Sequence, residues 1–103
     1  MKNIGPHELT TLLNEKDVLL VDVRNDNEVA QGMIKNALHV PLASINTWLE
    51  QQNSDHHYVF YCHVGVRSGT AGLLAEGHQF NNIYNLVGGV LAWHQAGYEF
   101  TQK

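Results

Sequence analysis

The sequence predicts an α/β fold in which helices cover both faces of a parallel sheet. Short runs of apolar and β-branched residues alternate along the chain with stretches that carry apolar residues at helical spacing. One of these runs, residues 18–23, is apolar without interruption up to Asp22, which is typical of a parallel strand buried on both faces. With 103 residues the chain has the size of one domain, so we expect residues 1–103 to form a single α/β unit.

The helical stretches have recognisable starts and stops. A first helix is expected from Pro6, which suits the first helical position, to about residues 14–16. A short capped helix is expected within residues 25–32, and two further helices over residues 43–50 and 90–95.

Four strands are expected between these helices. They cover residues 18–23, 37–40, 58–61 and 83–86. The polar residues 51–57 are expected to form a surface loop.

The composition excludes several classes of function. The formal net charge is -4 and no lysine or arginine cluster is present, so we expect no nucleic-acid partner. No apolar run is long enough to span a membrane, and the first residues lack the apolar core of a signal peptide. The single cysteine excludes an internal disulfide, and a reactive thiol survives best in a reducing compartment, so we expect a cytoplasmic protein.

That cysteine, Cys62, lies in a short polar loop between a predicted strand and a predicted helix that ends near Gly77. In such a turn the N–H groups of the loop and of the first helical residues point inward together and form a nest for negative charge. A nest of this kind stabilises a thiolate, so we expect the pKa of Cys62 to fall below the value of about 8.5 for a free cysteine. The loop therefore predicts a reactive cysteine.

Three neighbouring residues favour this interpretation over a structural one. A lone cysteine after an apolar strand is most often a small buried hydrophobic residue. Gly65, however, gives the loop backbone freedom, Arg67 adds a fixed positive charge near the sulfur, and Ser68 can cap the helix. A structural cysteine requires none of these features.

The histidines near the cysteine do not form a recognisable metal site. His56 and His57 precede the strand and His63 follows Cys62, but there is no second cysteine and no histidine pair at zinc-binding spacing. We expect surface histidines, no bound metal and no cofactor.

Three charged residues, Asp22, Arg24 and Glu28, follow the buried strand at residues 18–23. Ligands of open α/β sheets bind beyond the carboxyl ends of the strands, so these side chains lie where a site would form. We expect supporting roles for them. Asp22 would accept hydrogen bonds from nearby backbone or from Arg67, and Glu28 would pair with Arg24 or contact the cysteine loop.

The cysteine loop, Cys62–Ser68, reads Cys-x-x-Gly-x-Arg-Ser and resembles the active-site loop of rhodanese-like sulfurtransferases. Four other stretches resemble motifs of that family in the same order along the chain. They are Leu20–Arg24 with Glu28 at the usual offset, Gly32–Pro41, Asn85–Trp93 and Ala96–Gly97. Two positions depart from the family pattern, because Met33 replaces a histidine and Asn36 replaces a glycine. Asparagine tolerates the left-handed backbone that glycine adopts, so the second change is mild.

The resemblance implies the small rhodanese fold, a five-stranded, mainly parallel sheet with helices on both faces. It also implies that Cys62 is catalytic and lies at the base of a shallow pocket. The persulfide loop around it would comprise His63, Val64, Gly65, Val66, Arg67 and Ser68.

The chemistry that the resemblance implies is a two-step sulfur transfer through Cys62. The thiolate would take a sulfane sulfur from thiosulfate, a polysulfide or a persulfide, and pass it to a thiol or to cyanide. A protein could also be the sulfur donor. The sequence does not decide between a small donor and a protein donor, because donor choice depends on the rim of the pocket. Arg67 either adds charge or braces the loop against Asp22 or Glu28, and bracing is favoured. His63, at the mouth, either helps to recognise an anionic donor when protonated or is simply exposed.

Two other functions compete with sulfur transfer. Cysteine phosphatases also use a loop from cysteine to arginine, but the four residues between Cys62 and Arg67 are one fewer than theirs, and the tighter loop suits a single sulfur atom. A non-catalytic binding module or persulfide carrier for a protein partner is the main alternative. The presence of Cys62 and of an intact loop argues against a non-catalytic binding module, whereas a persulfide carrier that receives sulfur from a protein donor stays open.

Overall fold

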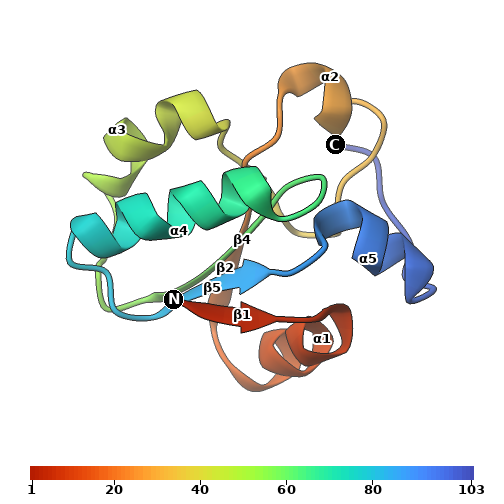
Figure 1. The fold of residues 1–103 in the computed structure, drawn as a ribbon, viewed down its shortest axis with the longest axis horizontal. Coiled ribbons are helices and arrows are strands. Elements are labelled where there is room, and N and C mark those ends of the chain that lie inside the picture. The colour runs from red at the N-terminus through yellow and green to blue at the C-terminus, as the bar shows by residue number, and fades with distance from the viewer.

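The computed structural model describes all residues 1–103 and contains one five-stranded, entirely parallel sheet with the order β1-β5-β4-β2-β3 (Figure 1). The strands are β1 (Lys2–Ile4), β2 (Val18–Asp22), β3 (Leu38–His39), β4 (His57–Tyr61) and β5 (Ile83–Leu86). The helices are α1 (Pro6–Glu15), α2 (Asp26–Val29), the 3-10 turn η1 (Leu42–Ser44), α3 (Ile45–Leu49), α4 (Val66–Gly77) and α5 (Gly89–Gln95). The predicted α/β fold with a five-stranded parallel sheet is confirmed.

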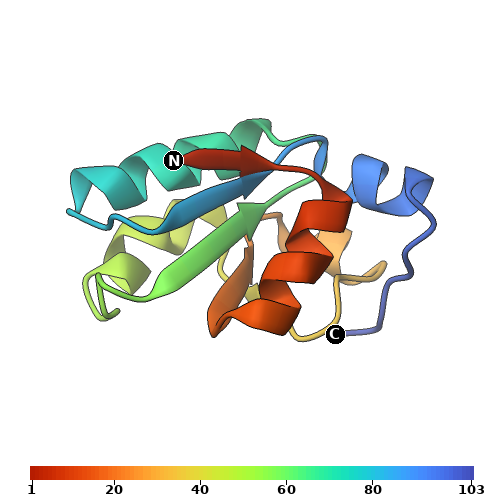
Figure 2. The same ribbon diagram turned by 90° about the horizontal axis from the view of Figure 1, so that it is seen from below.

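Helices cover both faces of this sheet (Figures 1 and 2). The core on one face, which includes Ile45 and Ala71, packs α3 and α4 against the sheet. The core on the other face, which includes Leu9 and Trp93, packs α1 and α5 against it. Strand β4 serves both, because Tyr58 and Phe60 belong to the first core while Val59 and Tyr61 belong to the second.

The sequence prediction missed strand β1. Its first two residues are exposed and only Ile4 is buried, so three residues at the sheet edge carry no readable pattern. Other boundaries shift slightly. His57 begins β4 and does not belong to the preceding loop, and the predicted helix over residues 43–50 is split into η1 and α3. None of the helices has the length and apolar character needed to cross a bilayer.

The parallel topology brings three loops to one edge of the sheet. Residues 62–65 follow β4, residues 23–25 follow β2, and residues 87–88 follow β5. The amino ends of α2, α4 and α5 lie at this same edge (Figure 1). The fold therefore gathers helix starts and loop N–H groups around the carboxyl end of its central strand.

Candidate active site

Cys62 directly follows β4 and is only 1 % exposed. Its side chain belongs to the core beneath α4, as expected from its place in the β4 alternation. The backbone then turns through Gly65, whose φ of 103° is accessible to glycine, and α4 begins at Val66. Because the loop closes in so few residues, it wraps tightly around the sulfur.

Two backbone N–H groups point at the Cys62 sulfur. The N–H of Gly65 lies 3.2 Å from Sγ and that of Ser68 lies 3.4 Å from it. The Ser68 hydroxyl is also 3.4 Å from Sγ. The prediction that Ser68 caps α4 is wrong. Gly65 occupies the cap position, and Ser68 lies within the first helical turn. Its hydroxyl faces the sulfur instead.

These contacts decide the ionisation of the thiol. Burial alone would raise the pKa of Cys62, but hydrogen bonds from Ser68, Gly65 and Val64 outweigh it and leave the pKa below its ordinary value. The start of the 12-residue helix α4 adds its positive end to the same site. The backbone N–H groups within hydrogen-bond distance of the sulfur are therefore those of Gly65 and Ser68, and not those of the whole loop.

Asn85 on β5 is a site residue that the sequence did not single out. Its Oδ1 accepts a hydrogen bond of 2.6 Å from the Ser68 hydroxyl, and its Nδ2 donates to the Gly65 carbonyl at 3.3 Å. Asn85 is 7 % exposed, and its two hydrogen bonds link the second half of the loop, from Gly65 to Ser68, to the sheet. Asn85 begins a stretch that resembles a family motif, but the sequence does not reveal its contacts with Gly65 and Ser68, because these residues lie far apart in the chain.

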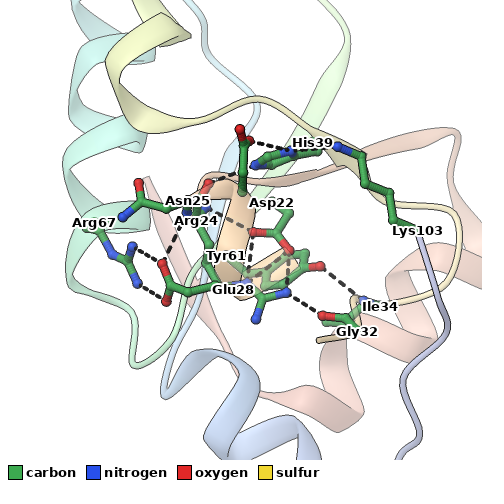
Figure 3. Close-up of polar contacts among 11 residues, drawn as sticks. Asp22, Arg24, Asn25, Glu28, Gly32, Ile34, His39, Tyr61, Arg67 and Lys103 are labelled. Carbon is green, nitrogen blue, oxygen red and sulfur yellow. Dashed lines mark hydrogen bonds and ion pairs between the residues drawn. The ribbon is translucent and has the colours of Figure 1, made fainter. Parts of the chain in front are cut away.

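Arg67 braces the loop through Glu28 rather than Asp22. Its two terminal nitrogens lie 2.7 and 2.8 Å from the two Glu28 carboxylate oxygens, in a fork that joins α4 to α2 (Figure 3). Hydrogen bonds from Arg67 lower the pKa of Glu28 to about 2. Glu28 therefore contacts the cysteine loop and does not form the local hydrogen-bonded pair with Arg24 that was the alternative.

Glu28→Gln is expected to lower the free energy of unfolding at neutral pH by about 1 kcal/mol. The loss is modest because both side chains of the ion pair are partly exposed and solvent screens their charges. The pKa of Glu28 is lowered in the folded state, so the pair stabilises the fold above the unfolded carboxyl pKa of about 4.3, and this stabilisation is lost as the pH falls toward about 2. Urea unfolding at several pH values should show the difference between wild type and variant vanish across that range. Glu50→Gln, which makes the same change at an exposed position after α3 where the carboxylate has no ion pair, is the control and should change little. A difference that persists at pH 2 would contradict this assignment.

Asp22 and Arg24 form a second, buried pair at the end of β2. Arg24 donates from Nε and Nη2 to both carboxylate oxygens of Asp22 at 2.8–3.1 Å, and Nη2 also donates to the Gly32 carbonyl at 2.7 Å (Figure 3). Asp22 also accepts the Arg24 backbone N–H at 2.9 Å. Asp22 thus fixes the turn after β2 and has no contact with Arg67.

The backbone of the β5–α5 turn touches the cysteine directly. The Val90 N–H donates to the Cys62 carbonyl at 3.0 Å, and Gly89 lies against it with a φ of 52°. A Cβ atom at residue 89 would be 2.3 Å from the Cys62 carbonyl oxygen and 2.6 Å from that of His63. Glycine is therefore required here both for its backbone conformation and for space.

Gly89→Ala is expected to destabilise the protein by about 3 kcal/mol, the sum of the left-handed strain and the cost of displacing a packed backbone. The shift would also move the Cys62 backbone and disturb the nest. Two controls separate these costs. Gly97→Ala has a left-handed φ of 89° without any close atom, and Gly77→Ala has neither strain nor contact. Thermal unfolding should show the largest loss of stability for Gly89→Ala, a smaller one for Gly97→Ala and the smallest for Gly77→Ala. Equal losses for Gly89→Ala and Gly97→Ala would show that the close contact of residue 89 with the Cys62 and His63 carbonyls is unimportant.

Residues 5–96 match the family model described as "Rhodanese-like domain". This chain belongs to that family. A protein named "Sulfurtransferase" from Allochromatium vinosum is 38 % identical over 86 residues, which are 84 % of this chain and 80 % of the relative. A "Thiosulfate sulfurtransferase GlpE" from Coxiella burnetii is 27 % identical over 92 residues, 89 % of this chain and 86 % of that protein.

Solved structures of rhodanese-like proteins share the fold. The rhodanese-like domain protein from Staphylococcus aureus superposes with a TM-score of 0.87 at 37 % identity and covers 100 % of this chain and 99 % of its own. The two departures from the rhodanese motifs are accommodated locally. Met33 is buried and its backbone pairs with Thr101 of the C-terminal segment, and Asn36 adopts the left-handed φ of 69° that a glycine would take.

Proposed function

We propose that this rhodanese-like protein carries sulfur as a persulfide on Cys62 and uses thiosulfate or a similar sulfane donor. The observation that carries this proposal is the buried sulfur held by the N–H groups of Gly65 and Ser68 at the start of α4. The same donors that favour the thiolate are suited to the negative terminal sulfur of a persulfide. The names of the sulfurtransferase relatives support this reading.

The chemistry balances in two displacements. The Cys62 thiolate attacks the outer sulfur of thiosulfate, a bond forms between the two sulfurs, and sulfite leaves with the electron pair of the broken S–S bond. A thiolate or cyanide then attacks the outer sulfur of the persulfide, and the Cys62 thiolate departs with its electrons restored. No general base takes part in the transfer itself, because the thiolate form of Cys62 is the nucleophile.

A protein partner is the alternative sulfur donor, with the domain acting as a persulfide carrier. The rim of the loop gives this alternative some support, because the side chains of Val64 and Val66 are 47 % and 72 % exposed. We place either activity in the cytoplasm, where the thiol remains reduced.

Thiocyanate formation from thiosulfate and cyanide tests the proposal. We expect repeated turnover, with an initial rate proportional to protein concentration. Polysulfide and a cysteine desulfurase charged with its own substrate serve as alternative donors. Turnover with the desulfurase alone would favour the carrier, and no turnover with any donor would overturn the sulfur-transfer proposal.

Ser68→Ala is expected to raise the pKa of Cys62 and to slow its alkylation several-fold near neutral pH. The Ser68 hydroxyl donates to Asn85 Oδ1 in this structure, but it lies 3.4 Å from Sγ and can turn its proton to the thiolate, which alanine cannot do. The rate of iodoacetamide alkylation measured against pH gives the midpoint. The wild-type midpoint should lie below that of a free cysteine, and the variant midpoint above the wild-type one. Thr70→Ala is the control, because Thr70 is an exposed residue of α4 two positions after Ser68. Identical midpoints for Ser68→Ala and wild type would show that the hydroxyl does not stabilise the thiolate.

A further inference from the structure

The side-chain amide of Asn85 has one orientation that satisfies its surroundings. Its Nδ2 lies 3.3 Å from the Gly65 carbonyl oxygen and 3.5 Å from Asn3 Oδ1. A carbonyl oxygen only accepts hydrogen bonds, so the amide NH₂ group has to face Gly65, because a flipped amide would set two oxygens against each other. The amide oxygen of Asn85, Oδ1, therefore faces Ser68.

The Ser68 hydroxyl has one proton and two neighbours that could receive it. Its Oγ lies 2.6 Å from Asn85 Oδ1 and 3.4 Å from Cys62 Sγ. Oδ1 has no proton of its own, and 2.6 Å is the separation of a short hydrogen bond, so the hydroxyl proton lies on the Asn85 side. The lone pairs of Oγ then face the sulfur. In this arrangement Ser68 can accept a hydrogen bond from the neutral thiol but donates none to the thiolate.

The backbone donors to the sulfur have no comparable choice. The N–H groups of Gly65 and Ser68 are held in place by the loop and by the first turn of α4, whereas the hydroxyl proton can turn about the Cβ–Oγ bond. Ser68 and Cys62 are 0 % and 1 % exposed, so bulk solvent does not reach either partner. Donation to the thiolate therefore requires the hydroxyl to give up its shorter hydrogen bond to Asn85.

We propose that Asn85 is a positioning residue that holds the Ser68 proton away from Cys62 and thereby opposes ionisation of the thiol. The asparagine and the sulfur compete for one donor, and the distances favour the asparagine. The inference deepens the proposed function and rests on it only for the use of the thiolate in sulfur transfer. Ionisation itself can be measured without any sulfur donor.

The charged side chains around the sulfur are paired or exposed, and the variants below leave all of them in place. Arg67 of α4 pairs with Glu28 of α2, and Arg24 pairs with Asp22 after β2. His63 beside the cysteine is exposed. The other titratable groups of the adjoining elements lie on the opposite face of the sheet or at the far ends of those elements, and they are His57, Tyr58, Tyr61, Glu76, Tyr84 and His94.

Asn85→Leu is the decisive variant. Leucine is similar in size and offers no acceptor, so the Ser68 hydroxyl becomes free to donate to the thiolate. The Gly65 carbonyl keeps the N–H of Gly69 at 3.1 Å and is not left unpaired. We expect the midpoint of thiolate formation, followed by ultraviolet absorbance and by iodoacetamide alkylation against pH, to fall. Below the wild-type midpoint, alkylation should become roughly threefold to tenfold faster.

The double variant Ser68→Ala/Asn85→Leu shows whether Asn85 acts through the hydroxyl. In the Ser68→Ala background the leucine should leave the midpoint nearly unchanged, whereas a general loosening of the loop would move it as far as in the single variant. Asn81→Leu, the same substitution at an exposed position before β5, is the matched control and should have no effect. If Asn85→Leu does not fold, Asn85→Val replaces it, since valine is smaller and suits a strand.

An unchanged or raised midpoint in the folded Asn85→Leu or Asn85→Val variant would overturn the inference. An equal fall of the midpoint in the Ser68→Ala background would overturn it as well. If the midpoint falls as expected but the wild-type protein forms no thiocyanate with any donor, only the proposed sulfur chemistry is overturned. The two ideas can therefore fail separately.

Discussion

Cys62→Ser is expected to reduce thiocyanate formation by more than about 10³-fold, because the nucleophile that accepts the sulfur is removed. The chain contains no other cysteine that could replace it. Serine is close to cysteine in size, and the site already holds donors for its oxygen, so the fold should persist. Steady-state rates with thiosulfate and cyanide measure the loss of activity. Thermal unfolding of the same samples shows whether the fold persists.

The matched control for this variant is Leu73→Ser. Leu73 is 63 % exposed on α4, so the substitution places a serine on the helix of the cysteine loop and leaves the sulfur untouched. Its turnover should stay within about twofold of wild type, as is usual for exposed positions away from a site. Substantial turnover by a folded Cys62→Ser variant would contradict the assigned role of the sulfur.

Asp22→Ala is expected to cost about 3–5 kcal/mol of stability, because it leaves the buried Arg24 cation without its partner. The change also removes the acceptor of the Arg24 backbone N–H, which shapes the turn after β2. In a domain of this size each kcal/mol lowers the melting temperature by about 4–8 °C, so calorimetry should detect the loss readily.

The double variant Asp22→Ala/Arg24→Leu separates the lost pair from the stranded charge. It should recover a large part of the stability, because no unpaired cation remains buried. Asp26→Ala, a carboxylate removed from an exposed position nearby, should cost less than about 0.5 kcal/mol. If the single and double variants were equally unstable, the buried charge would not be the cause.

The sequence predicted the interior strands well because burial leaves a readable pattern. Residues 18–21 and 58–61 are apolar or aromatic since both faces of β2 and β4 are covered. Strand β1 escaped notice because its pairing with β5 involves the backbone, and two of its three residues face solvent. A fifth strand was expected only through the family resemblance.

At the site, the sequence identified the residues of the cysteine loop but did not determine which charged side chains pair with one another. Cys62, Gly65 and Arg67 could be singled out because their chemistry is explicit in seven consecutive residues. Whether Glu28 pairs with Arg24 or with Arg67 depends on where α2 meets α4, and no local pattern encodes that distance. Asn85 was not expected as a site residue for the same reason.

The most direct test of Cys62 as the sulfur carrier is intact-protein mass spectrometry of the reduced protein after incubation with thiosulfate. We predict a gain of one sulfur atom that cyanide or a thiol then removes, and no gain in Cys62→Ser. Polysulfide, and a cysteine desulfurase supplied with its own substrate, extend the measurement to other donors. No gain with any of the three, or the same gain in the variant, would contradict the account.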